Sequence, residues 1–362
     1  MIPVGRPSIG REEEEAVTRV LRSGMLAQGP EVAGFEDQFA RYCGARHAVG
    51  VNSGTAALHA ALAALGIGAG HEVIVPAFTF FATGSAVCMC GARPVFADVD
   101  PDTFNLSVGS VQELLSQRTH AVIGVHLFGQ PCEVRPLREL CEERGIPFIE
   151  DAAQAHGAEY HGKRAGGLGT AGCFSFYPTK NMTSGEGGMV TLDDEVLAKR
   201  IRMFINHGQE EKYLHTCLGY NFRMTDIAAS IGKEQLKKLD GFNRRRREVA
   251  RYYDTHLRRE GILTPSVAPG MTHVYHQYVI RVTGDFPLSR DELARYLGDK
   301  GVGTAVHYPV PLHRQPVFSG FAGNTGCPAA DELAGAVLSL PVHPQVTDEE
   351  RAYICRVIQE VP

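Results

Sequence analysis

The chain has 362 residues, of which 44% are hydrophobic and 21% are charged, and its formal net charge is -5. This length favours about two domains, and the composition is that of a globular protein without an apolar run long enough to cross a bilayer. The slight excess of acids gives no basic footprint for nucleic acid. We therefore exclude nucleic-acid-binding and membrane-spanning functions.

The first residues run directly into an acidic helix start at Glu12–Glu15, without the basic, apolar and small-residue order of a secretory signal. We therefore expect a cytoplasmic protein. The nine cysteines are scattered, and the pair Cys88 and Cys90 has neither a second pair nor histidines at metal-ligand spacing. The sequence predicts reduced core cysteines and no metal site.

From residue 44 to about residue 236, short β-branched runs alternate with stretches able to form helices. The expected strands cover residues 47–52, 72–76, 94–99, 121–126 and 147–150. The expected helices cover residues 55–65, 83–90, 110–115 and 134–144. This alternation is typical of a mostly parallel sheet with helices on both faces, and it predicts an α/β fold.

The rhythm changes in the C-terminal third of the chain, where a helix over 243–257 precedes a strand over 275–282, a helix over 289–300 and a loop-rich stretch over 303–316. We therefore predict a large domain of residues 1–240, with an N-terminal helical segment, and a smaller C-terminal α+β domain of residues 241–362. The basic run Arg244–Arg247 is interpreted as a solvated or snorkelling face of the first of these helices, and a phosphate-binding patch is the alternative.

Ligands of open α/β sheets bind outside the carboxyl ends of the strands, so residues at the expected strand ends are candidates for chemistry. After the first strand, Ser53 opens a helix whose unpaired backbone N–H groups suit an anion. A phosphate cradle is predicted at Gly54, Thr55 and Ala56. An ordinary Ser/Thr helix cap is the alternative explanation of the same residues.

Two further strand ends supply an acid and an amine. Asp151 follows the 147–150 run, where a carboxylate needs a partner such as a pyridinium nitrogen, unless it is a structural cap. Lys180, 29 positions later, follows an apolar run, and limited solvation there makes an amine nucleophilic. Ser175 offers a hydroxyl to the same phosphate. Together these segments predict a pyridoxal-phosphate enzyme that holds its cofactor on Lys180 as a Schiff base.

The sequence resembles the DegT/DnrJ/EryC1/StrS family, which comprises sugar aminotransferases of the fold type I of pyridoxal-phosphate enzymes, over essentially the whole chain. The strongest matches are residues 149–157, 174–176, 180–181 and 185–188. Weaker matches are residues 53–58, 76–83, 219–224, 307–309 and 312–313. The resemblance implies the fold of that group, with a large domain built on a mostly parallel sheet and a smaller C-terminal α+β domain.

The resemblance also implies roles in cofactor binding. Lys180 is expected to form the imine with pyridoxal 5'-phosphate (PLP), Asp151 to contact the pyridine nitrogen, and Gln154 to bond near the ring hydroxyl. The remaining residues implied to touch the cofactor are Thr55 and Ala56 through backbone N–H groups, Ser175 through its hydroxyl, and Phe80 through its ring, for which a core aromatic is the alternative. Asn221 is expected to reach the phosphate of a neighbouring subunit, so the resemblance implies a homodimer with shared active sites.

The implied reaction moves an amino group from glutamate to a nucleotide-linked keto-sugar in amino-sugar biosynthesis, with pyridoxamine 5'-phosphate (PMP) as the intermediate cofactor form. The candidates for contacts with the sugar or its diphosphate are His207, Arg223, His307, Tyr308 and His313. Turn capping is the alternative role of the histidines at 307 and 313, and an intrasubunit ion pair is that of the arginine. The sugar, the choice between C3 and C4, and any assembly above a dimer stay open.

Three other classes remain as alternatives. The first is a PLP-dependent sugar dehydratase or lyase on the same fold, although related dehydratases carry histidine where this chain has Lys180. The second is a non-catalytic regulator of the family, which has no need to keep Lys180 or Asp151. The third is an unrelated phosphate-binding sheet protein, which has no need of both residues.

Overall fold

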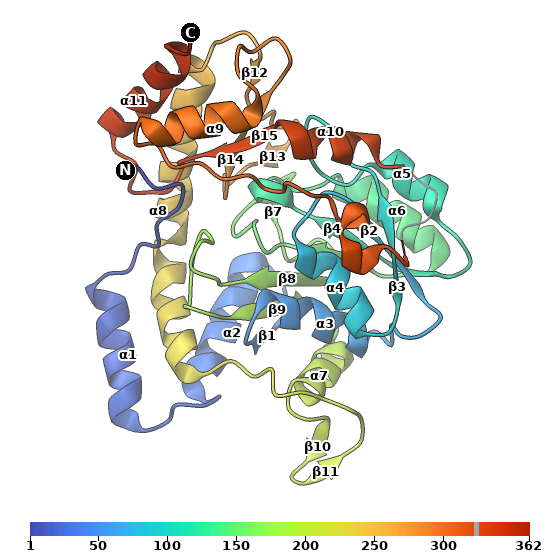
Figure 1. Cartoon of the computed structure of the whole chain (residues 1–362). Coiled ribbons are helices and arrows are strands. Elements are labelled where there is room, and N and C mark those ends of the chain that lie inside the picture. Colours follow the sequence, from blue (N-terminus) through green and yellow to red (C-terminus); the bar gives the residue numbers. More distant parts are fainter. Residues whose placement is uncertain (322–325) are drawn as a thin grey trace.

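The computed structural model describes residues 1–321 and 326–362. Its centre is a seven-stranded sheet in the order β1-β9-β8-β5-β4-β2-β3 (Figure 1). These strands are β1 (His47–Val51), β2 (Glu72–Pro76), β3 (Arg93–Ala97), β4 (Thr119–Val125), β5 (Phe148–Asp151), β8 (Ala171–Ser175) and β9 (Gly188–Leu192). The strands from β3 to β8 pair in parallel, and only β9 runs against its neighbours β8 and β1. The predicted α/β fold with a mostly parallel sheet is confirmed.

Helices cover both faces of this sheet, because alternate strand residues point to opposite sides. Val73 and Val75 of β2 belong to a core shared with α3, α4 and α7, whereas Ile74 between them packs in a core with α5 and α6. A further core joins α2 and α8 to β1, β8 and β9. The helices around the sheet are α1 (Arg11–Ser23), α2 (Pro30–Cys43), α3 (Gly54–Ala64), α4 (Phe81–Met89), α5 (Val108–Leu114), α6 (Val134–Arg144) and α7 (Glu195–Phe204).

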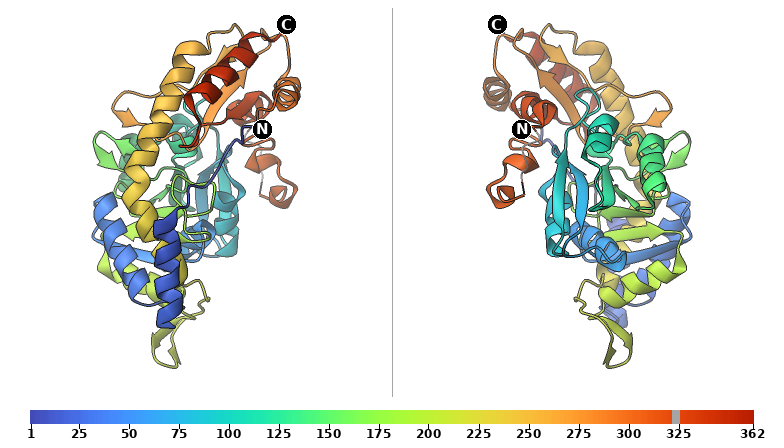
Figure 2. Two further views of the ribbon diagram at one scale, coloured as in Figure 1. Left: turned by 90° about the vertical axis from the view of Figure 1, so that its left-hand side faces the viewer. Right: turned by 90° about the vertical axis from the view of Figure 1, so that its right-hand side faces the viewer.

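A single long helix, α8 (Asp226–His256), links the main sheet to the C-terminal part of the chain (Figures 1 and 2). It begins well before the helix predicted from residue 243, because Thr225 caps it by accepting a hydrogen bond from the backbone N–H of Ala228. Its N-terminal half packs on α1 and α2. The helix passes residue 240 without a break, and the division of the chain into two domains there stays a prediction.

The C-terminal part has its own core, which includes residues from α8, β14, β15, α9 and α11. Its elements are β12 (Ile262–Leu263), β14 (Tyr278–Val282), α9 (Arg290–Asp299), α10 (Pro328–Ala336), β15 (Val337–Leu340) and α11 (Asp348–Gln359), with 3-10 turns at Leu312–Arg314 and Pro316–Phe318. The strand and helix expected over 275–282 and 289–300 are β14 and α9. The stretch 303–316 is loop-rich, as predicted.

Several short strands lie outside the seven-stranded sheet and the C-terminal sheet of β12, β14 and β15. Strands β6 (Glu159–Tyr160), β7 (Lys163–Arg164) and β13 (Met271–Thr272) form one small sheet, and β10 (Gln209–Glu211) and β11 (Leu214–His215) form an arm that projects from the body (Figure 1). A 3-10 turn, Leu127–Gly129, follows β4. In the described part of the chain, no helix combines the length and apolarity needed to cross a bilayer.

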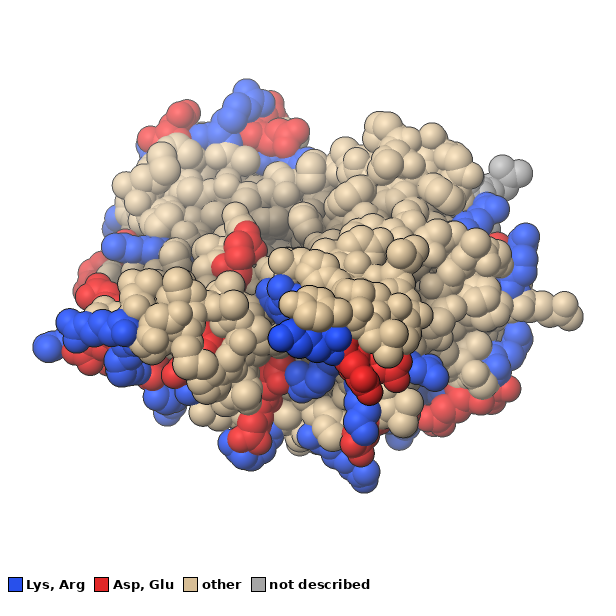
Figure 3. Space-filling model, turned by 90° about the horizontal axis from the view of Figure 1, so that it is seen from below, with Lys and Arg blue, Asp and Glu red and all other residues tan. Residues whose placement is uncertain are grey.

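Two further features of the molecule are the distribution of its surface charges and the positions of its cysteines. On the face shown in Figure 3, basic and acidic side chains are interspersed, and large areas carry neither. All nine cysteines are free, and six of them are buried, but Cys217 is exposed. The expected core position is therefore wrong for Cys217.

Candidate active site

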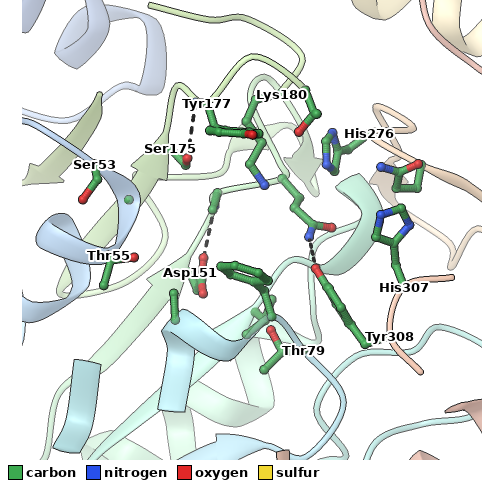
Figure 4. Close-up of a pocket in the computed structure, with 18 of the residues that line it drawn as sticks. Ser53, Thr55, Thr79, Asp151, Ser175, Tyr177, Lys180, His276, His307 and Tyr308 are labelled. Atoms are coloured by element: carbon green, nitrogen blue, oxygen red, sulfur yellow. Dashed lines mark hydrogen bonds between the residues drawn. The ribbon is translucent and has the colours of Figure 1, made fainter. Parts of the chain in front are cut away.

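A cavity of about 530 Å³ lies at the carboxyl ends of the strands and contains the residues that the sequence singled out (Figure 4). This volume is within the range of roughly 300–1,000 Å³ that small-molecule sites occupy. The predicted residues that line the cavity are Gly54, Thr55, Phe80, Asp151, Gln154, Ser175, Lys180, His307 and Tyr308. The first and last of these residues, Gly54 and Tyr308, are 254 positions apart in the sequence, so folding brings distant segments together here.

The N-terminus of α3 forms one end of the cavity. Ser53 caps the helix, and its Oγ accepts a hydrogen bond of 3.1 Å from the backbone N–H of Ala56. Ala56 is thus already bonded and does not line the cavity, whereas Gly54 and Thr55 do. A Cβ on Gly54 would lie 2.7 Å from the Cβ of Ser175, so only glycine lets the helix start approach the end of β8 this closely. The helix start and the Ser175 hydroxyl together suit a phosphate.

Asp151 is the last residue of β5, and its side chain is buried. Its Oδ2 accepts a hydrogen bond of 2.8 Å from the Thr83 hydroxyl, and its Oδ1 accepts one of 3.2 Å from the backbone N–H of Ala153. Burial raises the pKa of Asp151, and these hydrogen bonds oppose the rise. Among the described residues no cationic side chain forms an ion pair with it. A protonated ring nitrogen would supply the missing positive charge.

Lys180 lies in the turn after β8, where its backbone N–H donates to the carbonyl of Tyr177 at 2.9 Å. Its amine points into the cavity (Figure 4). Enclosure by the protein lowers the pKa of Lys180 to about 8, and the Asp151 carboxylate partly opposes this change. A larger share of the amine is therefore neutral near physiological pH, and the neutral amine is the nucleophilic form.

The C-terminal part of the chain closes the other side of the cavity. Gln154 accepts a hydrogen bond of 2.7 Å from the backbone N–H of Phe128 and donates one of 2.9 Å to the Tyr308 hydroxyl. His307 Nδ1 is 2.9 Å from the Ser339 hydroxyl, and burial lowers the pKa of His307 to about 4. The Phe80 ring is 54% exposed and lies 6.0 Å from that of Tyr308, so it faces the cavity instead of the core.

Besides Ala56, four predicted residues do not line this cavity: Asn221, His207, Arg223 and His313. Asn221 is exposed. The backbone segments 206–207 and 220–221, which contain His207 and Asn221, pair with each other. The arginine donates to the side-chain oxygen of Asn206 and has no ion pair in the part of the chain described. His313 belongs to the 3-10 turn Leu312–Arg314, and its Nε2 lies 3.1 Å from an Asp331 oxygen. Within one subunit, the structure does not bring these residues to the site.

The sequence does not predict several of the cavity residues. Arg246 belongs to the basic run interpreted as a solvated or snorkelling face, but it is buried, donates to the backbone carbonyls of Tyr275 and His276, and lines the cavity. A signal existed, because Arg246 shares the helical spacing of the buried Val249, Ala250 and Tyr253. The cavity residues His276 and Thr79, and the Asp151 partner Thr83, carried no comparable signal.

The chain is similar to known proteins over most of its length. Residues 7–359 match the model of the DegT/DnrJ/EryC1/StrS aminotransferase family. A dTDP-3-amino-3,4,6-trideoxy-alpha-D-glucose transaminase from Streptomyces venezuelae is 43% identical over 97% of this chain and 91% of its own length. A pleiotropic regulatory protein from Geobacillus stearothermophilus is 41% identical over 98% of this chain and 94% of its own length.

Solved structures are similar as well. The S. venezuelae protein DesV, in complex with a ketimine intermediate, has a TM-score of 0.92 and 41% identity, covering 96% of this chain and 94% of its own. Spr1654 from Streptococcus pneumoniae, assigned as a sugar aminotransferase, has a PLP form with a TM-score of 0.93 at 29% identity and a PMP form with 0.94 at 30%. These cover 99% of this chain and 97% and 96% of their own. The family and these forms point to PLP, and the chain belongs to the DegT/DnrJ/EryC1/StrS aminotransferase family.

Proposed function

We propose that this protein is a PLP-dependent aminotransferase that moves an amino group from glutamate to a nucleotide-linked keto-sugar. The observation that carries the proposal is one cavity that holds a helix N-terminus for a phosphate, the Asp151 carboxylate, which has no ion pair among the described residues, and the amine of Lys180 with its lowered pKa. These groups complement the phosphate, the ring nitrogen and the aldehyde of the cofactor.

The residues present fit this cofactor. Gly54, Thr55 and Ser175 would hold the phosphate, and Asp151 would hold the ring nitrogen. Lys180 would attach to the aldehyde carbon, and Phe80 would lie against the ring. When bound, the cofactor supplies an electron sink for negative charge that develops at the substrate carbon.

Side chains of the protein would then position the cofactor and substrate and move protons. The Asp151 carboxylate, held by Thr83 and Ala153, favours a positive charge on the group that it faces. The freed Lys180 amine takes the proton from the α-carbon of the donor as general base and later returns a proton to the new amino-bearing carbon of the sugar. The hydrogen bond from Gln154 to Tyr308 fixes the wall against which the substrate lies.

The substrate class rests on the relatives, among them the dTDP-amino-sugar transaminase from S. venezuelae. A second candidate function is regulation, since another relative bears the name of a pleiotropic regulatory protein. Lys180 and Asp151 are both retained here and lie in one cavity, which favours the catalytic role. Lysine at position 180 also disfavours the dehydratase alternative.

We also propose a homodimer with shared sites and PMP as the intermediate cofactor form. Support for the dimer comes from the β10–β11 arm and the segment after it, where Tyr213, Leu214 and Leu218 are 82%, 51% and 92% exposed. Apolar side chains gathered on a projecting arm are typical of a subunit interface. Asn221 lies exposed just after this segment, where a partner subunit can reach it.

The decisive experiment compares the wild type with Lys180→Ala. The wild type should develop a visible absorbance band with PLP, and it should transfer nitrogen from glutamate to at least one member of a panel of nucleotide keto-sugars, followed by mass spectrometry. Lys180→Ala should lose both, while the exposed control Lys237→Ala should keep both. Transamination retained by Lys180→Ala would refute the assignment, and a colourless wild type would remove its basis.

A further inference from the structure

A second cavity, of about 560 Å³, lies between α8 and the small sheet of β6, β7 and β13. The ion pair of 3.7 Å between Arg164 of β7 and Asp240 of α8 spans it, and the left view of Figure 2 shows these small strands beside the long helix. None of its lining residues belongs to the first cavity. The proposed aminotransferase reaction therefore leaves this space unused.

The charges around this cavity are not balanced. Three arginines, Arg164, Arg247 and Arg251, and two acids, Glu159 and Asp240, line it, which leaves one net positive charge (3 - 2 = +1). Arg164 lies near both acids, at 3.9 Å and 3.7 Å. In residues 1–321 and 326–362, neither Arg247 nor Arg251 has an ion pair or a side-chain hydrogen bond. These two guanidinium groups, one helical turn apart, are free to bind an anion.

A buried histidine adds a neutral donor to the same cavity. His273 is 5% exposed, and its Nδ1 accepts a hydrogen bond of 2.9 Å from the backbone N–H of Tyr275. In the neutral ring the proton is therefore on Nε2. Burial lowers the pKa of His273 to about 3, so this neutral form holds at physiological pH. No described residue accepts a hydrogen bond from Nε2, which leaves it as a donor for a ligand.

The floor of the cavity is fixed by buried hydrogen bonds. The Asn243 side chain donates to the carbonyl of His156 at 2.8 Å and accepts from Asn181 at 2.8 Å. Gly157 has a φ of +80°, and a Cβ there would lie 2.4 Å from the Tyr42 hydroxyl oxygen and 2.9 Å from Asn243 Nδ2. A rigid floor keeps the cavity open without a ligand, which reduces the entropy lost on binding.

We propose that this second cavity binds a small phosphate ester through Arg247, Arg251 and His273. Two guanidinium forks and a neutral N–H donor match the several oxygens and double negative charge of a phosphate monoester better than a single carboxylate. The volume exceeds that of a phosphate group, so the ester's organic part has room beside Tyr275 and Val267. This site is independent of the function proposed for the first cavity.

The test is a ³¹P NMR titration of the full-length protein, loaded with PLP and then freed of excess cofactor by gel filtration so that only the first cavity holds it, with ribose 5-phosphate and with inorganic phosphate as probes. We expect the wild type to bind the ester, and the double variant Arg247→Ala/Arg251→Ala to bind it at least tenfold more weakly. Arg244→Ala is the matched control, because Arg244 is an exposed arginine of the same helix outside the cavity. It should bind like the wild type.

Several outcomes would overturn this inference. They are the absence of ester binding by the wild type, equal affinity in the double variant, and an equal loss in Arg244→Ala. Stronger binding of malonate than of the ester would reject the phosphate assignment. Inorganic phosphate that binds as tightly as the ester would remove the role of the organic part. The cofactor absorbance band, read in the same samples, reports separately on the first cavity.

Discussion

At the scale of single residues, the surroundings of Lys180 and Asp151 disfavour the charged form of each side chain. Burial lowers the pKa of Lys180 and raises that of Asp151, and each group's charge partly offsets the shift of the other. Such opposed shifts in one cavity are typical of functional sites, because a structural ion pair would hold both groups charged. We therefore expect the folded protein without cofactor to be less stable than a variant with an apolar residue at position 180.

A substitution tests this statement. The pKa of Lys180 falls from 10.5 to about 8 on folding, so the unfolded chain binds more protons between these values and stability rises with pH across that window. Cofactor-free Lys180→Met should be more stable than the wild type by up to about 3 kcal/mol at pH 7, and the gain should fade between about pH 8 and 10.5. Urea unfolding measures it, with the exposed Lys237→Met as control. A gain that is constant with pH would indicate better packing instead of a removed charge.

At the scale of elements, the site depends on the close approach of α3 to β8. The helix start brings backbone N–H groups to the end of a strand that carries Ser175, and Gly54 is the point of contact. Because the would-be Cβ lies 2.7 Å from another Cβ, the backbone itself must move to admit a larger residue. The phosphate cradle is therefore a property of how two elements pack.

Gly54→Ala should lower the affinity for PLP at least tenfold, because the shifted helix start no longer aims its N–H groups at the phosphate. Titration of the absorbance band measures this affinity. Gly241→Ala is the control, since a Cβ there meets nothing within 4 Å. In the middle of α8 it should stabilise the protein by roughly 0.5–1 kcal/mol without any change in PLP affinity. Unchanged affinity in Gly54→Ala would place the phosphate elsewhere.

At the scale of the whole molecule, one chain brings most but not all of the predicted groups together. Asn221 is exposed and outside the cavity of its own subunit, close to the β10–β11 arm with its exposed apolar side chains. If the partner subunit receives Asn221, each complete site draws on two chains. Mixed dimers of two defective chains then contain one intact site.

Lys180→Ala and Asn221→Ala should each be inactive or nearly so at limiting PLP. Unfolded together and refolded as an equal mixture, they should regain up to about a quarter of the wild-type activity, since half of the dimers are mixed and each mixed dimer has one intact site of two. Transamination rates before and after mixing provide the measurement. No recovery, with dimers present by ultracentrifugation, would contradict the shared site.

The sequence by itself determined the order and type of many elements around the central sheet, the mostly parallel character of that sheet, and two residues, Asp151 and Lys180, that line one cavity. Hydrophobic periodicity is local, so strands such as β2 and helices such as α6 were predicted to within a residue or two. Asp151 and Lys180 were found because parallel strands end at one edge of a sheet, which makes position along the chain a guide to position in space.

Only the tertiary structure decided which other side chains surround those groups. The Thr83 hydroxyl donates to Asp151, 68 residues away, and Arg246 donates to backbone carbonyls of a segment about 30 residues later. The second cavity lies between α8 and the strands β6, β7 and β13, which are too short to produce a recognisable sequence pattern. Such contacts depend on how whole elements pack. The spacing of residues within one segment therefore cannot predict which residues from a distant part of the chain will contact it.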